Sequence, residues 1–161
     1  MTIASQVNLA TNMDLNEIKI APLDKNDAHC VAKIEKEVFS LPFKESDILE
    51  YLDSPIWHFF VIKRGKDILG YISLTIIIDE CQIVNVAITN SARGCGLGSW
   101  LVEYALDFAK QRGCNKAFLE VRASNENAIR LYKKFGFAES GISKSHYSLP
   151  REDALLMNLD M

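Results

Sequence analysis

The chain has 161 residues, of which 48% are hydrophobic and 24% are charged, and its formal net charge is −3 at pH 7. This length suits one domain with a sizeable core. The acidic balance gives no indication of direct nucleic-acid binding, and no apolar run reaches the ~18 residues that a membrane span needs.

Residues 1–15 contain no Lys or Arg and no continuous apolar stretch, so they lack the features of a secretory signal. We expect a mobile N-terminal extension over 1–15 and a single domain over 16–161. The histidines show no metal-ligand spacing, so we predict no bound metal. The cysteines are widely spaced, without a Cys-x-x-Cys pair, which predicts reduced thiols and a cytoplasmic protein. They are Cys30, Cys81, Cys95 and Cys114.

The first half of the domain is predicted to form a strand, two helices and three more strands. Apolar residues recur at three- and four-residue steps over 27–39, which predicts a helix capped by Asp24 or Asn26. A break at 40–43 separates it from a second helix over 44–52. Short turns join the later strands, which predicts an antiparallel meander. The strands are expected at 17–20, 57–63, 68–78 and 82–88.

A strand, a glycine-rich turn and a helix follow one another between residues 84 and 108. The turn holds Gly94, Gly96 and Gly98, and the apolar face of the helix begins at Leu101. A helix start carries unpaired N–H groups and partial positive charge, and glycine leaves room for phosphate oxygens to reach them. The turn therefore indicates a phosphate-binding loop, and the alternative is a glycine-rich helix entry without a ligand.

The spacing of these glycines identifies the kind of loop. It lacks the Gly-Lys-Ser/Thr of a Walker loop and the Gly-x-Gly-x-x-Gly of a dinucleotide fold. Arg93-x-x-Gly96-x-Gly98 fits the pattern Arg/Gln-x-x-Gly-x-Gly/Ala, which resembles the acetyl-CoA loop of the GNAT acetyltransferase superfamily. Gly94 stands where that superfamily usually has a second Arg, so one cation is absent from near the phosphates.

The second half of the domain is predicted to form a strand over 117–121, a helix closed by Gly136, and two last strands over 141–148 and 154–159. The whole order indicates an α/β fold. We expect a single GNAT-like domain with a mixed, mostly antiparallel sheet of six to seven strands, flanked by about four helices.

Three polar residues in this half have both structural and functional interpretations. Glu120 lies in an apolar strand and is either a water-facing residue, able to pair with Arg122, or a base. Tyr132 is either a core aromatic residue or an acid. Asn125 fits a helix cap, a contact to the pantetheine arm, or both.

The sequence resembles the ribosomal-protein-alanine N-acetyltransferase family within GNAT in several short segments, which are 119–125, 128–129, 131–132, 135–137 and Arg151-Glu152-Asp153-Ala154-Leu155-Leu156-Met157. The resemblance covers residues 17–161. It implies that Glu120 accepts a proton, that Tyr132 donates one, and that acetyl-CoA is the co-substrate. It also implies a set of acetyl-CoA contacts, which are Val86, Ala87, Ile88, Gly94, Cys95, Gly96, Leu97, Gly98, Ser99 and Asn125.

The same resemblance implies direct acetyl transfer to the N-terminal α-amine of a ribosomal protein, with alanine as the expected first residue. The acceptor is expected between residues 40–43 and the last hairpin, around 147–153. An α-amine with a pKa of ~8 is about one-tenth neutral at pH 7, against about one in 2,500 for a lysine. Other protein N-termini, lysines and small amines stay open as acceptors, as does a non-catalytic CoA-binding module, and the sequence leaves the oligomeric state open.

Overall fold

The computed structural model describes residues 15–161, so the expected extension over 1–15 lies outside the described residues apart from Leu15. The strands are β1 (Ile18–Pro22), β2 (Trp57–Arg64), β3 (Asp67–Ile77), β4 (Glu80–Ile88), β5 (Lys116–Arg122), β6 (Ala138–Ser148) and β7 (Arg151–Asp160). The α-helices are α1 (Ala28–Val38), α2 (Glu45–Leu52), α3 (Leu97–Gln111) and α4 (Glu126–Lys134). Short 3-10 helices are η2 (Leu15–Glu17), η3 (Lys25–Asp27) and η4 (Asn90–Ala92).

The strands form one mixed sheet in the order β1-β2-β3-β4-β5-β7-β6. All neighbours are antiparallel except β4 and β5, which are parallel because α3 crosses between them. The last strand, β7, lies between β5 and β6. The prediction of a mixed, mostly antiparallel sheet of six to seven strands with about four helices is confirmed.

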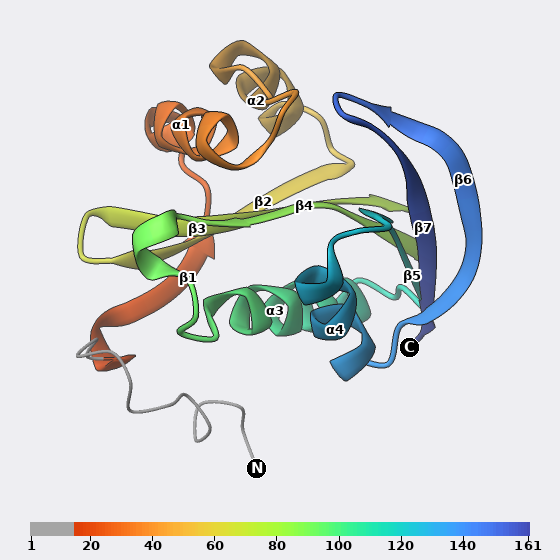
Figure 1. Cartoon of the computed structure of the whole chain (residues 1–161). Coiled ribbons are helices and arrows are strands. Elements are labelled where there is room, and N and C mark those ends of the chain that lie inside the picture. The colour runs from red at the N-terminus through yellow and green to blue at the C-terminus, as the bar shows by residue number, and fades with distance from the viewer. Residues whose placement is uncertain (1–14) are drawn as a thin grey trace.

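Helices cover both faces of this sheet (Figure 1). α1 and α2 pack on one face, where their apolar sides meet Phe59, Val61 and Tyr71. α3 and α4 pack on the other face against a larger core that includes Ile83 and Leu119. The β6–β7 hairpin bends toward the α1–α2 side (Figure 1).

The sheet opens between β4 and β5. The two strands pair only from Glu80 opposite Lys116 to Ile83 opposite Leu119. Beyond that point β4 continues along β3 to Ile88, and β5 continues along β7. A register shift in β3–β4 places Val84 between the paired positions as a bulge, which bends the strand away. Within the described residues, 84–88 therefore form a strand edge without a β5 partner.

The glycine-rich turn is shorter than the sequence indicated. Gly96 is the N-cap of α3, so Gly98 lies inside the first turn of the helix rather than in the loop before it. The predicted C-terminal ends of α3 and α4 are confirmed, since Gly113 and Gly136 adopt positive φ just after them. The predicted cap of the first helix is wrong, because Asp24 caps η3 by accepting from the Asn26 N–H, and α1 begins after Asp27, which makes no side-chain cap hydrogen bond. The four cysteines are free thiols, as predicted.

Candidate active site

The loop before α3 presents its backbone to solvent. Gly94 and Gly96 both have φ of 79°, in the left-handed region that favours glycine, and both are exposed. The side chains of Cys95 and Leu97 are buried and fix the loop to the core. Because the first N–H groups of a helix have no intrahelical partner, this end of α3 suits an anionic group.

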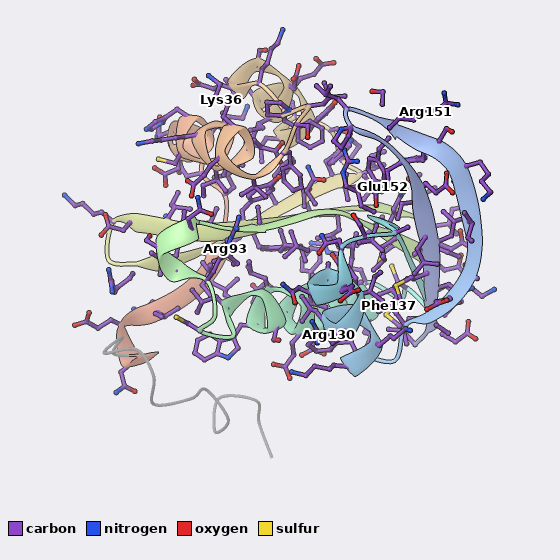
Figure 2. All side chains as sticks on the ribbon, in the orientation of Figure 1. Lys36, Arg93, Arg130, Phe137, Arg151 and Glu152 are labelled. Atoms are coloured by element: carbon purple, nitrogen blue, oxygen red, sulfur yellow. The ribbon has the colours of Figure 1, made fainter. Side chains whose placement is uncertain are left out.

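The space around the loop also supports its interpretation as a binding site for an anionic group. A Cβ added at Gly94 would meet no atom within 4 Å, and one at Gly98 would meet only Leu131, at 3.6 Å. Arg93 donates from Nε to the Ile88 carbonyl at 3.2 Å, so it ties the loop to the end of β4. Figure 2 shows Arg93 in the region between β4 and α3. The expected acetyl-CoA contacts on β4 and on the loop are therefore brought together at one side of the opening.

Glu120 lies on β5 just past the last β4–β5 pair, and 38% of its side chain is exposed. Its Oε2 is 2.8 Å from Nε2 of His146, on β6. Arg122 pairs with Glu152 instead, at 3.3 Å, so the alternative in which it pairs with Glu120 is wrong. The reason is that Arg122 also donates to the carbonyls of Leu149, at 2.9 Å, and Pro150, at 3.0 Å, in the β6–β7 turn. Figure 2 shows Glu152 on the inner side of β7.

Tyr132 is buried on α4, with its ring 5.8 Å from that of Phe137. Burial raises the pKa of Tyr132, and the nearby Tyr147 raises it further, so the hydroxyl stays protonated at neutral pH. The pKa of Tyr147 is itself raised by burial first and by the charge of Glu120 second. Tyr147 therefore lies near both Tyr132 and Glu120, and in the described part of the chain no hydrogen bond joins Glu120 to Tyr132 directly.

Asn125 is the N-cap of α4, and its side chain accepts a hydrogen bond from the Ala128 N–H at 3.2 Å. The predicted capping role is confirmed, and the contact to the cofactor stays a prediction. Glu152 accepts from the Ser124 N–H at 2.7 Å and so joins this turn to β7. The turn after β5 and the last hairpin are therefore held as one unit beside Glu120.

A cavity of about 310 Å³ adjoins Glu120 and extends toward the β3–β4 turn. Its lining comes from β3, β4, β5, β6 and β7 and consists of Thr75, Ile77, Glu80, Cys81, Gln82, Phe118, Leu119, Glu120, Ser140, Leu156 and Met157. Residues 15–161 contain no group of three or more His, Cys, Asp or Glu placed to hold a metal ion. Over the same residues, no helix is long and apolar enough to cross a membrane.

A buried carboxyl group supports the opening from the α1–α2 side. Glu35 on α1 is fully buried and accepts hydrogen bonds from the Phe43 N–H at 2.8 Å, from Asn85 at 2.9 Å and from the Tyr71 hydroxyl. Burial raises the pKa of Glu35 to about 7, although the bonds from Phe43 and Asn85 lower it. Glu35 thereby links the 40–43 segment to the strand that borders the opening.

Sequence reasoning missed Glu35 and His146. The sequence pattern indicates that Glu35 is buried, because Glu35 follows Val31 by four residues and so lies on the apolar face of α1. No sequence pattern indicates the position of His146, because a register shift in β6–β7 between Ser143 and Tyr147 determines where its side chain points.

Comparisons with known proteins agree with this geometry. Residues 28–137 match the model of the acetyltransferase (GNAT) family. A Bacillus subtilis protein provisionally named [ribosomal protein bS18]-alanine N-acetyltransferase is 39% identical over 132 residues, which are 81% of this chain and 87% of that protein. The Escherichia coli protein of that name is 31% identical, over 87% of this chain and 95% of its own. A crystal structure of the ribosomal-protein-S18-alanine N-acetyltransferase from E. coli superposes with a TM-score of 0.82 at 29% identity, covering 89% of this chain and 93% of that one.

Proposed function

The chain belongs to the acetyltransferase (GNAT) family, and on that premise we propose that it transfers the acetyl group of acetyl-CoA to the N-terminal α-amine of a ribosomal protein. The expected first residue of the acceptor is alanine, as in the names of the two relatives. Because its acceptor would be a ribosomal protein, we also propose that the enzyme acts in the cytoplasm.

The observation that carries this proposal is the juxtaposition at the β4–β5 opening. The edge of β4 over 84–88, which β5 leaves unpaired, leads through η4 into the glycine loop, and Glu120 lies on β5 just past the last β4–β5 pair. The backbone N–H groups at the start of α3 suit a pyrophosphate, and N–H groups on the free strand edge suit an amide chain or a thioester oxygen. The residues present therefore fit acetyl-CoA, which supplies an activated acetyl thioester.

The side chains supply the proton transfers. Glu120, exposed at the opening, takes the proton that the α-ammonium must lose before it attacks. Tyr132, kept protonated by burial, donates a proton to the departing thiolate and regains one from the attacking nitrogen, which must lose its second proton to become the amide nitrogen. The segment around Phe43 and the β6–β7 turn, held by Glu35 and Arg122, form the two walls between which the acceptor peptide approaches.

The acceptor class is tested with labelled acetyl-CoA and a panel of amines. We expect acetylation of a peptide with N-terminal alanine and an internal lysine, and fragment mass mapping should locate the label on the α-amine. The same peptide with a blocked N-terminus should stay unlabelled. Labelling of the blocked peptide, or faster turnover of a free polyamine, would replace the proposed acceptor.

The base is tested by Glu120→Gln. We expect kcat to fall by about 10²–10⁴-fold at neutral pH and the loss to shrink at high pH, where the amine deprotonates without help. Glu126→Gln is the control, because it removes an exposed carboxyl group at the start of α4. A folded Glu120→Gln enzyme with the wild-type rate and pH profile would show that the base lies elsewhere.

A further inference from the structure

His146 is the side chain that contacts the proposed base. Its Nε2 lies 2.8 Å from Oε2 of Glu120, within the range of a charge-assisted hydrogen bond. About one-third of each side chain is exposed, 35% for His146 and 38% for Glu120. The imidazole therefore touches the carboxyl group on one side and solvent on the other.

Other contacts hold the ring in this position. The Tyr147 ring packs against it edge-on, with centroids 4.9 Å apart, and the Arg122 guanidinium covers Tyr147 at 4.2 Å. The Ser143 hydroxyl lies 3.4 Å from Nδ1, on the side of the ring away from Glu120. The two ring nitrogens thus have different neighbours, as a proton carrier requires.

The other charged side chains nearby are held by partners of their own. Arg122 pairs with Glu152, Lys144 with Asp153, and Arg151 donates to Ser145. The titratable and charged groups around His146 are Glu120 and Arg122 on β5, Lys144 and Tyr147 on β6, and Arg151, Glu152 and Asp153 in β7. Glu120 is the one among them that is bonded to the imidazole.

The net reaction on an α-ammonium group releases one proton for each amide formed. We propose that His146 carries this proton from Glu120 to solvent and so returns Glu120 to its carboxylate form in every cycle. The inference rests on the proposed function, because it requires Glu120 to be the base.

The transfer balances without a further reactant. The amine proton bonds to Glu120 as the N–H bond breaks. Proton exchange with water brings neutral His146 to its Nδ1–H tautomer, and the proton on Oε2 then moves to the free Nε2, which makes His146 an imidazolium. The imidazolium gives one proton to water and becomes neutral again. Histidine side chains suit this step because they commonly gain and lose a proton between about pH 5 and 8.

The test is chemical rescue. In His146→Ala, we expect kcat at pH 7 to fall by about 10²-fold, the lower end for assisted proton transfer, with the KM for acetyl-CoA unchanged. Added imidazole should restore part of the rate, because the deleted ring leaves exposed space beside Glu120. His146→Gln can still donate to Glu120 but cannot carry a proton, so it should lose the same activity and regain none with imidazole.

The control is His29→Gln, which changes an exposed histidine on α1 and should leave the rate and the pH profile unchanged. A wild-type rate in His146→Ala, or full activity in His146→Gln, would overturn the proton-carrier role, as would a loss that imidazole does not reverse. If Glu120→Gln loses activity in the same assay, only the role of His146 has failed. If Glu120→Gln is fully active, the assignment of the base has failed.

Discussion

Replacing Glu35 by Gln should change how the stability of the fold depends on pH. Burial raises the pKa of this carboxyl group from 4.5 to about 7. Between those values the folded chain binds more protons than the unfolded chain, so the free energy of unfolding falls as the pH rises. A rise in pKa from 4.5 to about 7 corresponds to about 3 kcal/mol, because a tenfold change in proton affinity is worth about 1.36 kcal/mol.

Gln has nearly the same shape but does not titrate. It can accept from Tyr71 and Asn85, yet its amide nitrogen then faces the Phe43 N–H, which loses its acceptor. An unsatisfied buried donor costs about 1–3 kcal/mol, so the variant should be less stable than the wild type near pH 4.5. The deficit should shrink by up to about 3 kcal/mol by pH 8, because only the wild type then buries a charge.

Urea unfolding of both proteins at pH 4.5, 6, 7 and 8 measures this difference, and the other titrating groups cancel in it. Glu50→Gln, on the exposed side of α2, is the matched control and should keep the wild-type pH dependence. Parallel stability curves for the wild type and Glu35→Gln would refute the argument, since they would show that Glu35 takes up no proton on folding in this range.

Two predictions concern the cofactor and the acid. Gly96→Val should weaken CoA binding, because a branched side chain would stand in the loop, and calorimetry measures this loss. Gly113→Val is the control, because it imposes a similar strain at a positive-φ position at the far end of α3. It should leave CoA binding unchanged. Equal CoA affinity in the two folded variants would contradict the loop assignment. Tyr132→Phe should lower kcat while nearly keeping the affinity for acetyl-CoA, since only a hydroxyl is lost, and an unchanged kcat would remove Tyr132 from the mechanism.

Local patterns predicted most of the fold. The apolar stripe of α3, the cap at Asn125 and the terminating glycines at 113 and 136 all depend on neighbours within a few residues. The expected strands match β1 to β7 within a few residues at their ends. The insertion of β7 between β5 and β6 was not predicted, because strand order depends on contacts between residues far apart in the chain.

The sequence predicted those parts of the site that depend on residues close together in the chain. It did not predict the contacts between residues that are far apart in the chain. Glycine spacing located the loop because positive φ and a helix start are local requirements. The partner of Arg122 was missed because Glu152 is 30 residues away and reaches it through the β5–β7 register. His146 was missed for the same kind of reason, since irregular pairing in β6–β7 turns it toward Glu120.

Side chains of α1 support the β4 edge, and they connect the proposed acceptor side of the site with its proposed cofactor side. Where β5 diverges, 84–88 lose a hydrogen-bonding neighbour, and β3 alone pairs with them on the other side. α1 adds contacts at both ends of this stretch, because Glu35 accepts from Asn85 and Glu37 accepts from the Asn90 N–H at 2.8 Å. An edge that receives a ligand must stay open and yet keep its position, and side chains from α1 can hold it from the opposite face without filling the opening. Because Glu35 also holds Phe43, the same helix sets the distance between the acceptor wall and the strand that faces the cofactor.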